Sequence, residues 1–583
     1  MSEATSTSER PGVVEPEFRR TLDFLQSRRA VERLFARDAS LWKSAPDAAQ
    51  VIGNRLGWLD SPAWLEERIP ELHAFAAEVR SGGFTRVLLL GMGGSSLAPE
   101  VIASVLRAAP GAPTLEVLDS TDPAAVRSAE ATHRLDRTFF LVSSKSGRTI
   151  ETLSQYRYFR ARLDEMGLPD AGRRFAAITD PGSALERLAR EEGVRRVFLN
   201  PSDIGGRYSA LSYFGMVPAA LLGVDLTSLA ARAAEARERF RSDDPAENPA
   251  LRLGALLGAA ARAGRNKMTL LTSPTLRPLG YWIEQLVAES TGKEGSGILP
   301  VEGEPLGFPR YYSADRSFVA ITLVGAPDSE LERLGAELQG AGAPWAAIRL
   351  ADRADLAAEF VRWEVATAIA GAALEINPFD EPNVQESKDR TSEILAETER
   401  AGRLPSGPTR GRDGGVEIFA SDALWERLTA HAPAYPSLEM VLGRFFSLRR
   451  AGDYLALLAY VDRTAATESA FAQLRRGIRD ATQLPVLQGY GPRYLHSIGQ
   501  FYKGGPETGM FLVITADHAQ DLPIPESRLT FGRLETAQAL GDLASLDSRG
   551  KPALRLHMTE TVTGGLATIA HAVERALVSQ ASA

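Results

Sequence analysis

The chain has 583 residues, 44% of them hydrophobic and 24% charged, which is typical of a globular protein of about three or four domains. The absence of cysteine excludes disulfides, cysteine-ligated zinc, iron–sulfur clusters and thiol nucleophiles. The net charge of −8 argues against a nucleic-acid or anionic-membrane partner. No apolar run approaches the roughly 18 residues of a membrane span. We therefore expect a cytoplasmic enzyme.

The histidines do not form a metal-binding pattern. No two of them are spaced to bind one metal ion from the same face of a helix, so the sequence predicts no histidine-based metal site. A metal site built only from carboxylates is the alternative, and no motif suggests one. The seven are His73, His133, His431, His496, His518, His557 and His571.

The chain begins with an expected polar tail followed by helices. Residues 1–15 are rich in Ser, Thr and Glu and lack an apolar core, so we expect a disordered tail and no secretory signal. Residues 16–65 carry apolar side chains at helical spacing, for example Val51, Ile52 and Leu56.

A first α/β domain is expected over residues 66–225. Short apolar runs alternate there with amphipathic stretches such as Ile150–Leu163 and Ala184–Arg190. This alternation predicts a parallel sheet with helices on both faces. The expected strands are Val87–Leu90, Leu115–Leu118, Phe139–Val142, Phe175–Ile178 and Val194–Leu199.

A second α/β domain is expected over residues 226–397 and a third unit over 416–583, joined by a linker rich in Gly, Pro and Arg at 398–415. The third unit is similar to a degraded copy of the second. Pro309-Arg310-Tyr311 before FVAITL matches Pro492-Arg493-Tyr494 before FLVIT, with chance similarity as the alternative. The expected strands are Met268–Leu271, Phe318–Leu323, Ala346–Leu350, Leu484–Leu487, Met510–Ile514 and Ala553–Leu556.

Two loops at the ends of expected strands have the composition of anion-binding loops. They are VLLLGMGGSSLAPE at 87–100 and FFLVSSKSGRTIET at 139–152. Glycines let the backbone approach a ligand, and hydroxyls, a lysine and free N–H groups at a helix N-terminus favour a phosphate. The alternatives are a tight strand–helix turn and an N-cap with spare serines. The candidate binding residues are Gly94, Ser95, Ser144, Lys145, Ser146 and Thr149.

Two further motifs point to proton transfer. In NPSDIGGRYSALSYFG at 200–215, a turn at Gly206 precedes Arg207, which could stabilise an oxyanion or form a surface ion pair. In YWIEQLVAESTGKEG at 281–295, Gln285 and Glu289 share a helical face. Partial burial would raise the pKa of Glu289 toward that of a general base, and a helix-end glutamate is the alternative.

Two motifs later in the chain contribute a lysine and a histidine. NPFDEPNVQESK at 377–388 places Lys388 near the start of an expected helix, where an exposed lysine is the commoner case. YGPRYLHSIGQFYKGG at 490–505 places His496 between a Gly-Pro turn and a glycine. A lone histidine is usually structural, so only its context makes His496 a candidate.

Together these six motifs resemble the glucose-6-phosphate isomerase (phosphoglucose isomerase) family, built from sugar isomerase (SIS) domains. The closest likeness is to the isomerase half of fused transaldolase–isomerase proteins, over about residues 60–390 and 485–515, with no length left for a transaldolase barrel. The resemblance implies an α/β fold of SIS-type doubly wound parallel sheets, in two SIS domains plus a C-terminal SIS-like unit. It also implies interconversion of glucose 6-phosphate and fructose 6-phosphate through an enediolate, in glycolysis and gluconeogenesis, without metal or cofactor.

The resemblance assigns a role to each candidate. It places the sugar phosphate on the two anion-binding loops, beside Gly206. Glu289 would move the proton between C2 and C1, and Arg207 would stabilise the enediolate. Gln285 would lie beside the substrate, Lys388 near the sugar ring, and His496 would assist ring opening.

Two departures from the family pattern affect these roles. Glu381 stands where the family often has glutamine, and because a carboxylate repels phosphate we expect it to point away or to matter less. The order Glu289, Lys388, His496 differs from that of short bacterial isomerases, in which the histidine precedes the lysine. We therefore expect the third unit to deliver His496, either within one chain or across a homodimer.

Two other functions stay open at this point. One is a SIS protein that binds a sugar phosphate and regulates a partner without catalysis, and the joint presence of Glu289, Arg207 and Lys388 argues against it. The other is an isomerase that also acts on mannose 6-phosphate.

Overall fold

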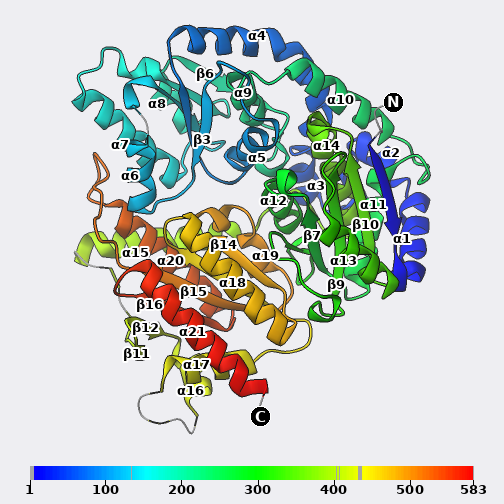
Figure 1. Ribbon diagram of the computed structural model, residues 1–583. Coiled ribbons are helices and arrows are strands. Elements are labelled where there is room, and N and C mark those ends of the chain that lie inside the picture. The colour runs from blue at the N-terminus through cyan, green and yellow to red at the C-terminus, as the bar shows by residue number, and fades with distance from the viewer. Residues whose placement is uncertain are drawn as a thin grey trace.

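The computed structural model describes residues 5–132, 134–401, 404–405, 407–430, 433 and 436–581 (Figure 1). Of the seven histidines, His133 and His431 lie outside these ranges. The chain forms three sheets, each largely parallel and covered by helices. Among the described residues, no helix has the length and apolar composition needed to cross a membrane.

The first sheet has the order β3-β2-β4-β5-β6, and all its strands are parallel. Every residue of its central strands β2 and β4 is buried, which explains their continuous apolar sequences. All five strands predicted for this unit are present. The strands are β2 (Arg86–Gly91), β3 (Thr114–Leu118), β4 (Thr138–Ser143), β5 (Phe175–Thr179) and β6 (Arg196–Leu199).

Helices cover both faces of this sheet. Several begin with a capping side chain, as at Asp122, whose carboxylate accepts hydrogen bonds from the N–H groups of Ala124 and Ala125. The helices are α5 (Leu97–Leu106), α6 (Pro123–Ala131), α7 (Ile150–Glu165), α8 (Ala184–Glu191) and α9 (Tyr213–Leu221), with 3-10 turns η4 (Gly93–Ser95), η5 (Leu135–Arg137), η6 (Ala171–Arg174) and η7 (Gly206–Tyr208).

The N-terminal residues are more ordered than predicted. Ser6–Arg10 form strand β1, which pairs antiparallel with β10 at the edge of the second sheet, so the expectation of a disordered tail is wrong for these residues. Backbone pairing needs no apolar side chains, and Glu9 adds an ion pair with Arg252 at 2.7 Å. The helices that follow are α1 (Glu15–Ser27), α2 (Ala30–Phe35), α3 (Pro46–Gly53) and α4 (Ser61–Ser81), with turns η1 (Gly12–Val14), η2 (Ala39–Leu41) and η3 (Gly57–Asp60).

The second sheet has the order β1-β10-β9-β7-β8, in which β7 to β10 are parallel. Its strands are β7 (Lys267–Thr272), β8 (Leu299–Val301), β9 (Arg316–Leu323) and β10 (Trp345–Leu350). Its helices are α10 (Leu226–Arg239), α11 (Pro249–Arg262), α12 (Leu279–Thr291), α13 (Ser329–Gly340) and α14 (Leu356–Ala373), with turns η8 (Pro274–Leu276), η9 (Pro309–Tyr311) and η10 (Arg353–Asp355).

The third sheet has the order β11-β12-β16-β15-β13-β14. Its central strand β13 was not predicted. Strand β14 begins at Val486, two residues after the start of the predicted strand Leu484–Leu487. Its strands are β11 (Gly411–Asp413), β12 (Val416–Phe419), β13 (Tyr454–Tyr460), β14 (Val486–Tyr490), β15 (Gly509–Ala516) and β16 (Ala553–Met558). Its helices are α16 (Asp422–Thr429), α17 (Leu438–Ser447), α18 (Ala465–Thr482), α19 (Gly499–Gly504), α20 (Phe531–Ser548) and α21 (Val562–Ala581), with turn η11 (Arg493–His496).

The second and third sheets share one topology. The parallel order β10-β9-β7-β8 has its counterpart in β16-β15-β13-β14, and an antiparallel strand, β1 or β12, pairs with the outer member of each set. The motifs Pro309-Arg310-Tyr311 and Pro492-Arg493-Tyr494 lie at equivalent places, between the second and third parallel strands in chain order. The shared strand order supports the interpretation of the third unit as a copy of the second.

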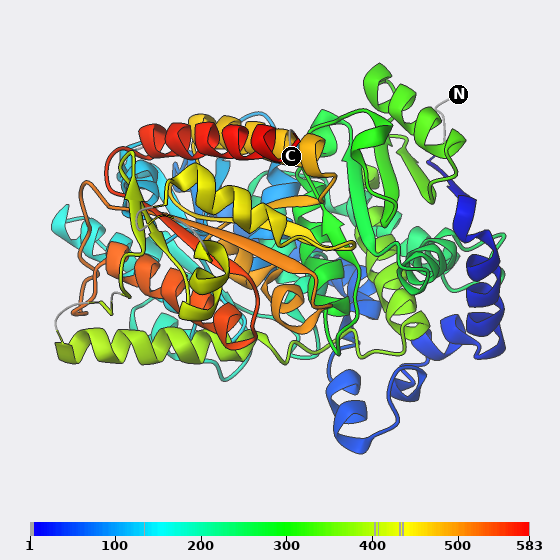
Figure 2. The same ribbon diagram turned by 90° about the horizontal axis from the view of Figure 1, so that it is seen from below.

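Helix α15 (Val384–Ala401) connects the second unit to the third. It lies along α20 and away from the second sheet (Figure 2). It is helical through Ala401, and β11 begins at Gly411, so the predicted irregular linker at 398–415 is wrong at both ends. The helix expected around Lys388 is present, and it extends four residues into the stretch predicted as linker.

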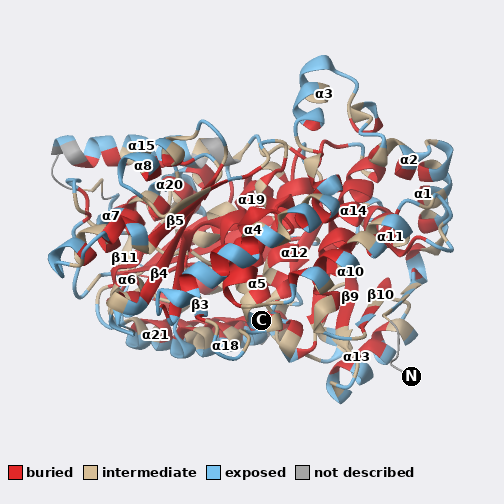
Figure 3. Cartoon of the chain, turned by 90° about the horizontal axis from the view of Figure 1, so that it is seen from above, coloured by how far each residue is buried: buried red, intermediate tan, exposed pale blue. Residues whose placement is uncertain are grey.

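The core holds the units together. One apolar cluster contains Phe75 of α4, Leu89 of β2 and Ile321 of β9, so the first two sheets share it. Another contains Phe159 of α7 and Phe531 of α20, so the third unit packs against the first. Buried residues are continuous from sheet to sheet (Figure 3). This packing fixes the loops at the ends of the strands relative to one another.

Candidate active site

Three loops that are distant in sequence meet at two glycines. A Cβ at Gly94 would lie 2.1 Å from the carbonyl oxygen of Gly206, and one at Gly93 would lie 2.6 Å from that of His496. Gly93 also has a φ of +55°, which disfavours other residues. Glycine at these positions therefore lets η4, η7 and η11 approach one another, and Ser95 lies in the same turn.

The hydroxyl-rich loop between β4 and α7 is ordered by its own side chains. The Ser144 and Thr149 hydroxyls lie 2.9 Å apart, and Ser144 Oγ also accepts a hydrogen bond from the N–H of Gly147 at 3.1 Å. Ser146 is exposed, and its Oγ accepts from the N–H of Arg148 at 3.3 Å. These groups surround the N-terminus of α7, which favours an anion.

Lys145 belongs to this loop but is already paired. Its Nζ donates to Asp180 Oδ2 at 2.5 Å and to the carbonyl oxygen of Ser202 at 3.0 Å. Burial raises the pKa of Asp180 and the hydrogen bond from Lys145 opposes the rise. A phosphate at this loop would share Lys145 with Asp180.

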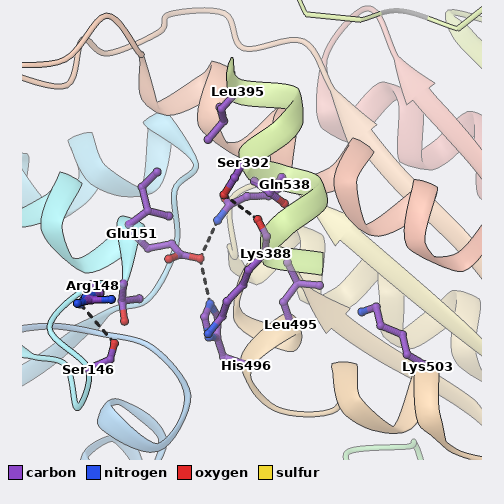
Figure 4. A pocket seen from close by; sticks show the side chains of 13 residues that line it. Ser146, Arg148, Glu151, Lys388, Ser392, Leu395, Leu495, His496, Lys503 and Gln538 are labelled. Atoms are coloured by element: carbon purple, nitrogen blue, oxygen red, sulfur yellow. Dashed lines mark hydrogen bonds and ion pairs between the residues drawn. The ribbon is translucent and has the colours of Figure 1, made fainter. Parts of the chain in front are cut away.

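A cavity of about 460 Å³ opens beside the hydroxyl-rich loop. Residues from three parts of the chain line it: the start of α7, helix α15 and the third unit (Figure 4). The predicted Thr149, Lys388 and His496 are among them, so the structure brings His496 into one cavity with Lys388 of the same chain. The lining includes Ser146, Thr149, Glu151, Lys388, His496 and Gln538.

His496 is held by a buried chain of hydrogen bonds. Its Nε2 lies 3.0 Å from Glu151 Oε1, which also accepts from Gln538 Nε2 at 2.7 Å. Gln538 Oε1 in turn accepts from Thr121 Oγ1 at 2.8 Å. Burial raises the pKa of Glu151, but the charge of His496 and their hydrogen bond outweigh it and hold the pKa below its usual range. Glu151 therefore stays ionised and orients the imidazole.

A second cluster, centred on Arg207, adjoins the cavity through the glycine turn. The buried guanidinium donates to Ser290 Oγ at 2.8 Å, to Glu381 Oε2 at 3.0 Å and to two main-chain carbonyls. Glu289 Oε2 lies 3.7 Å from Arg207 Nη1. Gln285, one turn earlier on α12, donates from Nε2 to the carbonyl oxygen of His496 at 2.7 Å. Helix α12 therefore carries both Glu289 and a residue that binds the His496 backbone, and the charge of His496 acts on Glu289.

The environment of Glu289 suits a general base. Burial raises its pKa to about 7, with Arg207 opposing the rise and Glu381 adding to it. Lys293, near the end of the same motif, donates to Asp380 Oδ1 at 2.7 Å, and burial together with Arg207 lowers its pKa to about 8. A carboxylate with a pKa near neutrality can both take and return a proton.

Glu381 is a partner of the buried arginine. Its carboxylate accepts a hydrogen bond from Arg207 and repels Glu289. Arg207 lies 3.0 Å from Glu381 Oε2, so this carboxylate acts in the structure mainly through its charge on Arg207 and Glu289.

Replacing Glu381 is expected to shift the pH dependence of catalysis. Glu381→Gln removes a negative charge that raises the pKa of Glu289 and frees Arg207 to stabilise the Glu289 carboxylate. Both effects lower the pKa of Glu289, so the acid limb of kcat/KM, near pH 7 in the wild type, moves to lower pH. A pH profile from 5 to 9 measures the shift, and an unchanged limb would show that Glu381 does not act on the base.

Sequence reasoning missed Glu151, Gln538 and Lys293. Glu151 has the pattern of a first-turn helix glutamate, and Gln538 lies within a helix with no motif. Both become significant only through a partner more than 340 residues away in sequence, since 345 residues separate Glu151 from His496. Lys293 lies inside the quoted motif YWIEQLVAESTGKEG, and its position near the helix end was the available signal.

The helix-covered parallel sheets of this chain recur in solved structures, which share its fold. A glucose-6-phosphate isomerase from Chlamydia trachomatis superposes with a TM-score of 0.53 at 18% identity, over 66% of this chain and 86% of that one. A hypothetical protein of Thermus thermophilus superposes with a TM-score of 0.56 at 24% identity, over 67% of this chain and all of that one.

Sequence comparison identifies the family. Residues 57–297 match the sequence model described as "Phosphoglucose isomerase". The chain is 32% identical over 369 residues to glucose-6-phosphate isomerase of Rubrobacter xylanophilus, covering 83% of that protein and 54% of this chain. It therefore belongs to the phosphoglucose isomerase family. It is 35% identical over 292 residues to the enzyme of Thermosynechococcus vestitus, spanning about half (54%) of that protein's length and 46% of this chain.

Proposed function

We propose that this chain is a cytoplasmic glucose-6-phosphate isomerase that interconverts glucose 6-phosphate and fructose 6-phosphate. The observation that carries the proposal is the buried Glu289, with a pKa near 7, placed 3.7 Å from Arg207. Aldose–ketose isomerisation moves one proton next to a carbonyl group. It needs a carboxylate base and a cation that stabilises the enediolate.

In this proposal the phosphate and the sugar ring both lie in the cavity of about 460 Å³. The phosphate would bind Ser146, Thr149 and the N-terminus of α7, where hydroxyls and main-chain N–H groups favour an anion. This remote contact supplies binding energy that orients the reacting carbons. The ring would lie toward Lys388 and His496, and its C1 and C2 would extend past Gly93 toward Arg207 and Glu289.

The steps follow from these positions. His496, oriented by Glu151, moves a proton between the ring oxygen and the C1 hydroxyl, so the ring C1–O bond breaks and the C1 aldehyde forms. Glu289 then removes the C2 proton, and Arg207 stabilises the negative charge on the enediolate oxygen. Glu289 returns the proton to C1, and the hydroxyl proton moves between O2 and O1. The product is the ketose, with no net change in composition.

A coupled assay tests the proposal. Purified protein is mixed with fructose 6-phosphate, and glucose 6-phosphate formation is followed by coupled NADP reduction. We expect a kcat of roughly 1–10³ s⁻¹, typical of enzymes. Binding of fructose 6-phosphate in calorimetry without turnover would instead indicate a non-catalytic regulator. Mannose 6-phosphate, assayed in parallel, measures the sugar specificity.

The structure leads us to expect that His496 acts within its own chain. His496→Ala should lower kcat by about 10²-fold, because it removes a general acid–base group. Co-expression of His496→Ala with Glu289→Gln chains, each carrying a different tag, yields mixed species if the protein forms dimers. These should show no more activity than the single variants, because each chain then has one defective site. Recovery of activity in the mixed species would show that His496 reaches a neighbouring chain.

A further inference from the structure

A cluster of acidic and imidazole side chains lies where α20 meets the first unit, outside the catalytic cavity. Asp122 precedes α6 in the first unit, His518 follows β15, and Glu535 lies on α20. One oxygen or nitrogen atom from each of the three lies within 4.8 Å of the others. Asp122 and Glu535 are buried, and His518 is partly exposed. The fold therefore brings together three side chains that no local sequence pattern connects.

Glu535 is the least satisfied member of this cluster. The residue is 1% exposed, and its Oε2 lies 3.2 Å from His518 Nε2. Its Oε1 is buried and has no hydrogen-bond partner among the described residues. Burial and the negative charges of Asp122, Asp462 and Asp521 all raise its pKa. A buried carboxylate in this environment is costly unless a cation accompanies it.

The other two side chains are held in place. Asp122 Oδ1 accepts hydrogen bonds from the N–H groups at the start of α6, at 2.6 Å and 3.3 Å. Asp521 accepts from the N–H of Gly532 at 2.8 Å and so fixes the loop that carries His518. A Cβ at Gly532 would lie 2.5 Å from His518 Cδ2, so only glycine lets the imidazole approach α20 this closely. The cluster is thus a preformed arrangement.

We propose that Asp122, His518 and Glu535 bind a divalent transition-metal cation of the Zn²⁺ or Mn²⁺ type. Imidazole and carboxylate groups are the ligands that such ions take in proteins. The cation would be bound by the Glu535 carboxylate and would offset the repulsion among Asp122, Glu535, Asp462 and Asp521. Because its ligands come from the first unit and from the third, it would clamp α20 against the first unit.

The proposed cation would lie next to the hydrogen bonds that connect Thr121, Gln538 and Glu151 at the catalytic cavity. Thr121, which donates to Gln538, immediately precedes Asp122, and Gln538 lies one turn beyond Glu535 on α20. The cation would thereby hold the face of α20 that contacts Glu151. Its role is to position these residues, and the inference does not depend on the isomerase activity.

Metal titration of the complete protein tests the site. After EDTA treatment and dialysis, Zn²⁺ and Mn²⁺ are titrated separately by calorimetry and by thermal unfolding. We expect about one equivalent of at least one ion to bind and to raise Tm by a few degrees, because a ligand of the folded state stabilises it. His518→Ala and Glu535→Gln should each weaken binding by at least tenfold and abolish the rise in Tm. His73→Ala and Glu574→Gln, at exposed positions elsewhere, serve as matched controls.

Glu535→Gln distinguishes loss of a metal ligand from loss of folding, because it removes a buried carboxylate without changing the size of the side chain. The metal-free variant should be at least as stable as the metal-free wild type. If neither ion raises the wild-type Tm at millimolar concentration, the cluster binds no such cation and the proposal is wrong. Binding that survives in both cluster variants would also overturn it, since the ion would then lie elsewhere.

Discussion

Glu289→Gln should lower kcat by about 10³-fold while leaving fructose 6-phosphate binding within a few-fold of the wild type. The amide has nearly the same shape but cannot accept the C2 proton, and general bases contribute roughly 10²–10⁴-fold to such reactions. The fold should stay stable, because Arg207 keeps its ion pair with Glu381 at 3.0 Å when Glu289 becomes an amide. Steady-state kinetics in the coupled assay and calorimetry with fructose 6-phosphate measure the two quantities.

A matched control lies five residues along the chain. Glu294 is exposed and pairs with Lys43 at 2.9 Å, so Glu294→Gln should leave both kcat and binding unchanged. Full activity in Glu289→Gln would remove this residue from the role of base. The buried Glu284, with a pKa raised to about 8, would then be the next carboxylate to examine on the same helix.

Arg207→Lys should lower kcat by about 10²–10³-fold, the usual cost of losing a preorganised donor to an oxyanion. The guanidinium donates to Ser290, Glu381 and two main-chain carbonyls at once, and an ammonium cannot match that planar geometry. The lysine ammonium would be held less firmly beside Glu289 and would stabilise its carboxylate less than Arg207 does. The pKa of Glu289 should therefore rise. The acid limb of kcat/KM therefore moves upward, opposite to the shift expected for Glu381→Gln.

The opposite shifts distinguish an electrostatic effect from general damage. Arg528→Lys, at an exposed loop position, is the control and should change neither kcat nor the pH profile. Because Arg207 ties η7 to residues 378–381, we also expect a lower Tm for Arg207→Lys. A variant that loses Tm but keeps kcat and the wild-type pH profile would show that Arg207 is structural.

The sequence predicted the first sheet well because buried parallel strands are continuous apolar runs followed by distinctive loops. β2 and β4 illustrate this, since each run is bounded by Gly or Ser. β1 could not be recognised in the same way, because STSER is polar and becomes a strand only by pairing with β10. β8 has three residues, one of them proline, and carries too little signal. β13, in contrast, has the continuous apolar run YLALLAY that is typical of a buried parallel strand.

The candidate site was predictable to the extent that its motifs are local. Gly93, Gly94 and the hydroxyl-rich loop stand out because glycines and serines cluster at strand ends. Glu151, the partner of His496, does not stand out in the sequence, because acidic residues are common in the first turn of a helix. Whether Glu381 opposes a phosphate or binds Arg207 depends on the path of residues 378–381, which the sequence alone does not give.

The distance in sequence between Glu151 and its partners has a consequence for biosynthesis. Hydrogen bonds to His496 and Gln538 span 345 and 387 residues, so a ribosome must complete most of the chain before these contacts form. Until then the nascent protein holds the base and the phosphate loop without the imidazole. It also exposes the apolar surface around Phe159 that Phe531 later covers. The unfinished chain should therefore be inactive and should need a chaperone.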